Sequence, residues 1–150
     1  MQRCLEVAKQ HQAEPEFLSI YYGEIGDLQV MLGRPAEGLA DLLIALQFAG
    51  ELDKCRRHYQ IAEAYLKLGS LEAADQHLAE AKRLVQAGLI VHPSRRVGAI
   101  LVRAKYWYGL GARNEALHRA RKALALAEEL HLSIRVEQAK ALIAQIEGNP

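Results

Sequence analysis

The sequence predicts an all-α protein built as an array of stacked helical hairpins, and three observations support this fold class. Apolar residues recur with the spacing of a helical face, and no stretch alternates with period two over the length of a strand. Four of the apolar segments end at a glycine: Gly33, Gly69, Gly111 and Gly148. Successive glycines are separated by roughly 40 residues, a period within the range of stacked repeat arrays.

Small residues recur in register with these glycines. A small residue precedes each glycine by the same interval, namely Gly26, Ala62, Ala104 and Ala141. Each of the first three glycines is followed, at the same intervals, by two small residues and then a large apolar residue. These sets are Gly38–Ala45–Phe48, Ala74–Ala81–Leu84 and Ala116–Ala123–Leu126. Two antiparallel helices approach closely only where both contribute small side chains, and larger residues fill the flanking spaces. The pattern therefore predicts paired helices.

The predicted helices cover residues 2–12, 16–32, 35–49, 52–68, 71–87, 93–110, 113–130 and 133–147. Pro15 separates the first two of them. Gly33 ends the helix 16–32, because a helix often terminates on a residue with positive φ that glycine adopts without strain. Pro35 begins the next helix, where its missing N–H costs no hydrogen bond.

The later helices are delimited by similar signals. Gly69 ends the helix 52–68, and Ser70 is expected to cap the helix 71–87, with Glu72 suited to the helix dipole. A longer connection precedes Pro93, which begins the helix 93–110. Gly111 ends that helix. Residues 134–148 form only the first half of a further repeat, so we expect the chain to be a fragment of a longer array.

The segment 58–84 resembles the tetratricopeptide repeat (TPR) family. Its first helix carries Ile61, Ala62 and Tyr65, and its second carries Ala74, Leu78 and Ala81, at the positions of the family's packing residues. The next repeat matches through Ala104, Trp107, Gly111, Ala116, Ala120 and Ala123, whereas the first departs from the motif at Gly26, Gln29 and Gly38.

The resemblance implies a right-handed superhelical α-solenoid of about three and a half TPR-like helical hairpins. It divides the chain into one array, 1–150, with repeats at about 19–52, 55–88 and 97–130 and a half repeat at 134–148. The repeats are longer than the usual motif, as in the extended TPR arrays of kinesin light chains, Rap-type regulators and MalT-like activators.

The composition favours a non-catalytic protein. Nineteen basic and eighteen acidic residues leave a formal net charge of +1, so no direct nucleic-acid or membrane partner is predicted. Neither a long apolar run nor a signal peptide is evident, and Cys4 and Cys55 form no redox or metal motif, which predicts a cytoplasmic protein. The six histidines include no metal-binding pair on one helix face, and His58 is expected to pack while the others lie at the surface. We expect no metal, no cofactor and no enzyme activity.

A stripe on the first helix of each pair is the predicted binding surface, since the resemblance places that stripe on the inner, concave wall. The predicted partner-binding residues are Asp27, Met31, Arg56, Tyr59, Glu63, Lys67, Leu101, Lys105 and Tyr108, and the half repeat adds Arg135, Gln138 and Leu142 to the stripe. One interpretation is a cradle for a peptide or helix of a partner protein. The alternative is an ordinary solvated face with local pairs such as Glu63 with Lys67.

Two functions are compatible with these features. The first is a protein–protein interaction scaffold that holds a peptide or helical segment of a partner in the concave groove. The second is a ligand- or peptide-sensing regulatory module of a bacterial signalling protein or transcription activator. The glycines Gly23, Gly26 and Gly38 favour the second, because each weakens its helix and could act as a hinge. The sequence does not determine the partner or the oligomeric state.

Overall fold

The computed structural model describes residues 14–88 and 92–148, and these residues form helices joined by short connections. The helices are α2 (Pro15–Met31), α3 (Pro35–Phe48), α4 (Glu51–Lys67), α5 (Leu71–Gln86), α6 (Pro93–Gly109), α7 (Arg113–Glu129) and α8 (Ser133–Gly148). Their ends agree with the predicted ends to about one residue, well inside the usual uncertainty of helix boundaries. The helix predicted over residues 2–12 lies outside the described residues.

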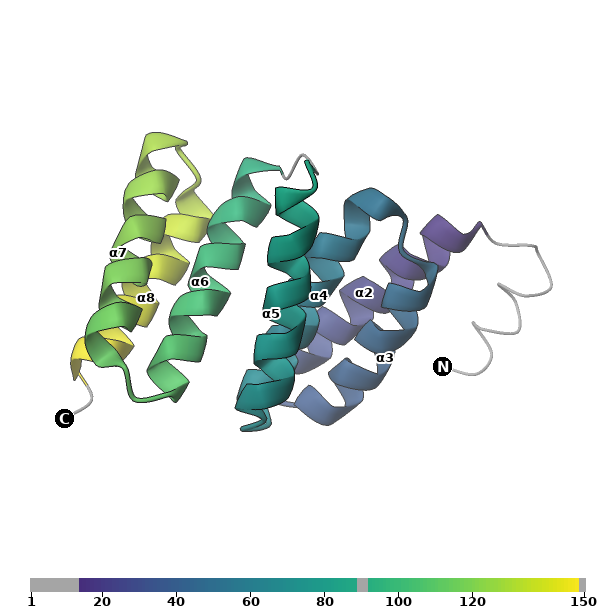
Figure 1. Ribbon diagram of the computed structural model, residues 1–150, viewed down its shortest axis with the longest axis horizontal. Helices are drawn as coiled ribbons and strands as arrows, with labels where there is room; N and C mark the ends of the chain where they lie inside the picture. The colour runs from purple at the N-terminus through teal and green to yellow at the C-terminus, as the bar shows by residue number, and fades with distance from the viewer. Residues whose placement is uncertain (1–13, 89–91, 149–150) are drawn as a thin grey trace.

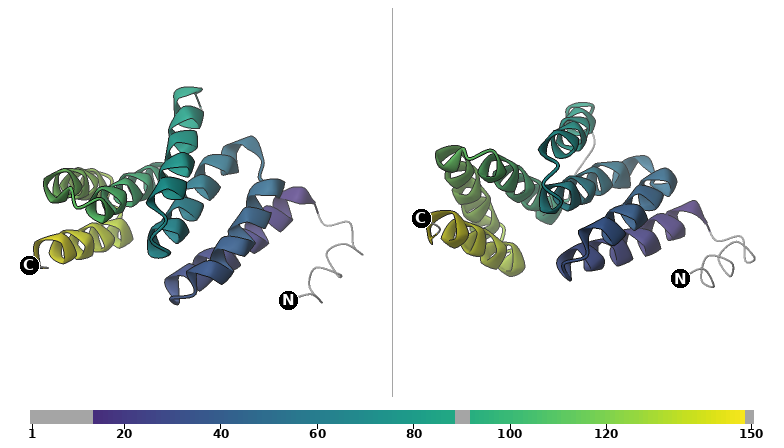
Figure 2. Two further views of the ribbon diagram at one scale, coloured as in Figure 1. Left: turned by 60° about the horizontal axis from the view of Figure 1, so that its bottom comes forward. Right: turned by 90° about the horizontal axis from the view of Figure 1, so that it is seen from below.

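Successive helices lie side by side along the molecule (Figure 1). The pairs α2–α3, α4–α5 and α6–α7 form hairpins, and α8 packs on α7. The first helices also contact one another, α4 with α2 and with α6, and α6 with α8. Figure 2 shows α5 projecting to the side opposite α2 and α8. The structure is thus an all-α, repeat-like stack in which α2, α4, α6 and α8 share one side.

The small residues in register lie where the helices of a pair touch. Ala62, Ala74, Ala104 and Ala116 are all fully buried, as the prediction of paired helices required. Ala141 is an exception because it is exposed on α8. Its register position is correct, but no described helix packs against that face of α8.

Gly26 and Gly38 bring α2 and α3 into the closest contact. A Cβ atom on Gly26 would lie 2.8 Å from the carbonyl oxygen of Gly38, and one on Gly38 would lie 2.5 Å from the carbonyl oxygen of Gly26. Both distances are too short for a methyl group. The glycines that replace alanines in the first repeat therefore permit a backbone-to-backbone contact.

The turns confirm three of the four glycine predictions. Gly33, Gly69 and Gly111 have φ of 79°, 76° and 77°, but Gly148 remains in α8. His131 takes the left-handed conformation at the turn before α8, with φ of 54°. Histidine is one of the residues enriched in this region, and the glycine pattern could not reveal it. The predicted cap by Ser70 is absent, since its side chain makes no capping hydrogen bond.

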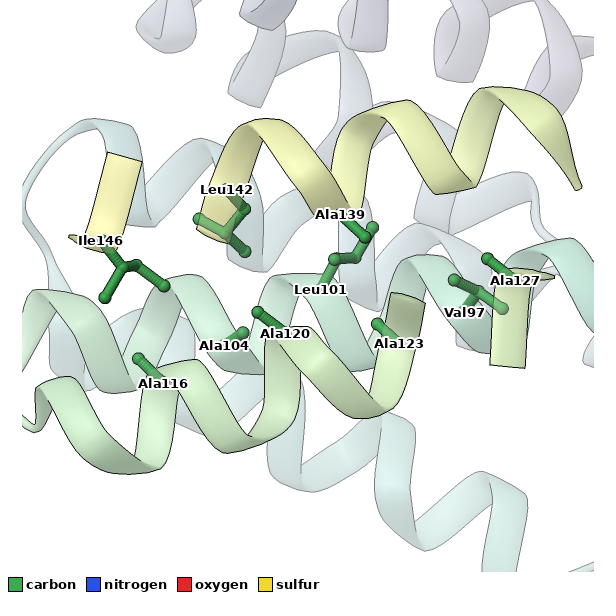
Figure 3. Close-up of a cluster of buried hydrophobic side chains, with 10 residues drawn as sticks. All are labelled: Val97, Leu101, Ala104, Ala116, Ala120, Ala123, Ala127, Ala139, Leu142 and Ile146. Carbon is green, nitrogen blue, oxygen red and sulfur yellow. The ribbon is translucent and has the colours of Figure 1, made fainter. Parts of the chain in front are cut away.

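The largest buried cluster joins α6, α7 and α8 (Figure 3). Alanines dominate it, with Val97, Leu101, Leu142 and Ile146 filling the spaces between the helices. The predicted exposure of Leu101 on a binding face is wrong. Its side chain is only 4% exposed, because α8 covers the face of α6 on which it lies.

Among the helices that the structure describes, none has the length and apolar character of a membrane span.

Candidate functional site

The side shared by α2, α4, α6 and α8 contains two adjoining hollows, which we call the inner groove. The first has a volume of about 120 Å³ and is lined by Asp27, Arg56, Tyr59, Gln60, Glu63, Arg95, Gly98, Ala99, Val102 and Arg135. The second has a volume of about 500 Å³ and is lined by Arg56, His92, Ser94, Arg95 and Arg135. Four successive first helices thus contribute side chains to one polar surface.

Ion pairs link neighbouring first helices across the groove. Arg56 on α4 lies 2.6 Å from Glu24 on α2, and Arg95 on α6 lies 3.4 Å from Asp53 on α4. Lys105 on α6 pairs with Glu63 on α4. These side chains are partly exposed, so each pair contributes only ~0–1 kcal/mol to stability. Their main effect is to fix the positions of charged groups along the groove.

Arg135 differs because, among the described residues, no carboxylate forms an ion pair with it. Its Nη1 donates to Gln138 Oε1 at 2.8 Å and its Nε donates to Ser94 Oγ at 3.2 Å. The guanidinium lies against Gly98, where a Cβ atom would approach Nη2 to 2.9 Å. Partial burial lowers the pKa of Arg135, although an arginine stays protonated in water. Arg135 is therefore a positioned cation with neutral hydrogen-bond partners.

Arg57 is buried between α2 and α4, beneath the groove. Its side chain is inaccessible to solvent. It donates to Gln60 Oε1 at 2.7 Å and to Ser19 Oγ at 3.4 Å, while its Nη2 has no hydrogen-bond partner. A Cβ atom on Gly23 would lie 2.1 Å from Nη1 of Arg57. Burial lowers the pKa of Arg57, and Gly23 is the residue that makes room for this guanidinium.

Asp27 adds an acidic group to the same hollow as Arg135, and its charge acts on Arg135. Burial is the main cause that raises the pKa of this carboxyl, and the nearby Glu63 raises it further. A hydrogen bond from Gln60 and the charge of Arg56 act against this shift. A donor or cation that reaches Asp27 would therefore stabilise its carboxylate. This hollow thus contains Arg135, which has no ion pair among the described residues, and Asp27, whose carboxylate a further donor would stabilise.

The structure brings together only part of the predicted site. Asp27, Arg56, Tyr59 and Glu63 line the groove, and Lys105 reaches it through Glu63. Among the remaining predicted residues, Met31, Lys67, Leu101 and Tyr108 do not line it.

Leu101 is buried, and each of the other three has a different environment. Met31 is 70% exposed, and Tyr108 packs on the cluster of α6, α7 and α8. The Nζ of Lys67 donates to the carbonyl oxygen of Val30 at 3.0 Å. The pairing of Lys67 with Glu63 was wrong, because Lys105 from the next first helix reaches Glu63 instead.

The sequence analysis did not place Gln60, Arg95 or Gly98 at the binding surface. One signal could have found Gly98. A glycine within a first helix faces an arginine of the next first helix in both halves of the chain, at Gly23 with Arg57 and at Gly98 with Arg135. Such a glycine marks where a guanidinium lies flat against the backbone.

A histidine pair lies outside the groove, between α4 and α5. The Nδ1 atoms of His58 and His77 are 2.9 Å apart, and the ring of Tyr65 stacks on His77. His77 is half-buried, so its predicted surface position was wrong. Burial lowers the pKa of both histidines. The described residues contain no group of three side chains suited to hold a metal ion.

Comparisons with known proteins do not assign this chain to a family. No protein-family model matches the chain, and neither a curated protein nor a solved structure shows significant similarity to it.

Proposed function

We propose that this chain is a TPR-like, right-handed superhelical solenoid whose inner groove binds an extended segment of a partner protein without catalysing a reaction. The observation that carries the proposal is Arg135, which lines the groove with no carboxylate at ion-pair distance among the described residues, although the charges of Glu63 and Asp27 act on it. Neighbouring arginines already have acidic partners. A carboxylate of a bound segment would give Arg135 an ion pair like those of Arg56 and Arg95.

The layout of the groove favours a polypeptide over a compact ligand. Its lining comes from α2, α4, α6 and α8, and the second hollow adjoins the first at Arg56, Arg95 and Arg135, so an extended segment can occupy both hollows. Tyr59 adds a half-buried aromatic side chain to the lining of the first hollow. Tyrosine and arginine are among the residues that contribute most binding energy at protein interfaces. A segment with an acidic residue toward Arg135 and a basic residue toward Asp27 would match the groove.

A selection from a library of displayed extended peptides tests this proposal. Peptides that bind the intact chain should lose about tenfold in affinity, or ~1.4 kcal/mol, with Arg135→Ala and with Tyr59→Ala. Lys140→Ala is the matched control, because Lys140 lies on the same helix as Arg135 but outside the groove. Unchanged affinity in both groove variants, measured by fluorescence anisotropy, would contradict the proposal.

A regulatory module is the second candidate, favoured by the junction between α5 and α6. These helices contact each other far less extensively than α3 contacts α4 or α7 contacts α8. A thin junction between packed units is a natural place for a change in relative orientation. Small-angle scattering should then show a change in radius of gyration when a selected peptide binds. An unchanged scattering profile at saturation would favour the passive scaffold.

A further inference from the structure

A second concave surface lies between α5 and α7, and residues of α6 and α7 form its floor. It forms because α5 turns away from α6 and α7 (Figures 1 and 2). The cleft has a volume of about 740 Å³, and its lining comes from α4, α5, α6 and α7. We call it the α5–α7 cleft. It is larger than either hollow of the inner groove.

The surface of the cleft combines an apolar floor with a basic rim. Ala99, Ile100, Ala125 and Leu126 form the floor, and Val85 of α5 adds an aliphatic side chain that is 42% exposed. An aliphatic strip between two helices is suited to the apolar face of a third helix.

The rim contains three cations, Arg96, Arg103 and Lys122, and one carboxylate, Glu129. Arg103 donates to the carbonyl oxygen of Leu78 at 2.8 Å and hydrogen-bonds the side chain of Tyr59. Over residues 14–88 and 92–148, no ion pair joins Arg96, Arg103 or Lys122 to an acidic side chain. The cleft therefore has an excess of positive charge that its own residues do not neutralise.

We propose that the α5–α7 cleft binds an acidic amphipathic helix of a partner protein, as a second docking site that adjoins the inner groove at Tyr59 and Ala99. Leucine-like side chains of that helix would cover Ile100, Leu126 and Val85. Glutamates or aspartates on its flanks would reach Arg96 and Lys122. Charge complementarity selects this occupant, because a basic or neutral helix would leave the three cations without acidic partners at the edge of an apolar contact.

The aliphatic floor argues against a nucleic-acid ligand. Nucleic-acid affinity depends mainly on phosphate contacts, and single strands also need aromatic surfaces for base stacking. The floor of this cleft is aliphatic, and its one aromatic lining residue, Tyr59, is held by Arg103.

The test uses the full chain and a fluorescent synthetic peptide of about 16 residues, with leucines three and four positions apart and glutamates on both flanks. We expect saturable binding by fluorescence anisotropy, and binding about tenfold weaker after Arg96→Glu combined with Lys122→Glu. Ala125→Trp should cause a similar loss, because the indole would fill the cleft. All three residues are exposed, and circular dichroism should show unchanged helicity.

Matched controls separate this site from the inner groove and from general charge effects. Lys82→Glu reverses an exposed charge on α5 outside the cleft and should leave peptide binding unchanged, as should Arg135→Ala. A peptide with lysines in place of the glutamates should not bind. The proposal is overturned if the acidic peptide does not bind, if the lysine peptide or a single-stranded oligonucleotide binds equally well, or if the cleft variants have no effect.

Discussion

The N-terminal half, α2 to α5, and the C-terminal half, α6 to α8, solve the same packing problem differently. The C-terminal half has one continuous buried cluster built largely of alanines. The N-terminal half has several smaller clusters and buries polar groups, namely Ser19, Gln29, Asp41 and Arg57. Gly23, Gly26 and Gly38 lie at close contacts in this half, where a Cβ atom would clash with Arg57 or with the facing helix. Helical hairpins of the same repeat can therefore bury either an alanine-rich core or polar side chains, as long as small residues stay at the helix contacts.

The largest effect is expected at the α2–α3 contact. Gly38→Ala should lower the free energy of unfolding by about 2 kcal/mol, because overpacking against the Gly26 backbone outweighs the ~1 kcal/mol that alanine adds to helix propensity. Gly148→Ala is the control, since a Cβ atom there meets nothing within 4 Å. Urea denaturation measures both. Equal stabilities would show that the α2–α3 contact can accommodate a methyl group at position 38.

An intermediate effect is expected from the two arginine–glycine contacts. Gly23→Ala should destabilise the chain by about 1 kcal/mol, because buried Arg57 has little space in which to move. Gly98→Ala should change stability by less than about 0.5 kcal/mol, since Arg135 is partly exposed and can shift while alanine favours the helix.

A double variant identifies the cause of this difference. Adding Arg57→Met should cancel the cost of Gly23→Ala, because methionine ends before the position of the guanidinium. A double-mutant cycle with no coupling between positions 23 and 57 would contradict the steric explanation.

The smallest effect is a pH dependence confined to the N-terminal half. The pKa values of His58 and His77 are lowered in the folded state, mainly by burial. Their contribution to stability is therefore present above the unfolded histidine pKa and is lost as the pH falls through the lower folded values. The raised pKa of the Asp27 carboxyl acts in the opposite direction, so the test compares variants: between pH 7.5 and pH 5, wild type should lose more stability to urea than His77→Phe does. His118→Ala, at an exposed position of α7, should leave the pH dependence unchanged.

Local signals explain why the helices could be predicted so closely. Pro35 and Pro93 begin helices, and Gly33, Gly69 and Gly111 end them, through backbone preferences that act within a few residues. The burial of Ala74 and Ala116 followed from their repeated register. The predicted site was less accurate because the helical period gives the direction of a side chain but not the helix that covers it. Leu101 lies on the expected stripe, yet α8 buries it.

The sequence by itself determined the all-helical class, the helix boundaries and the small residues at which paired helices touch, because each depends on nearby residues or on a repeated interval. Three features came from the tertiary structure alone: Lys105 reaches Glu63, the guanidinium of Arg135 lies against Gly98, and α5 turns away to open a cleft above α6. These features depend on the angles between hairpins. Such angles result from the sum of many weak side-chain contacts between distant residues, and no single local pattern encodes them.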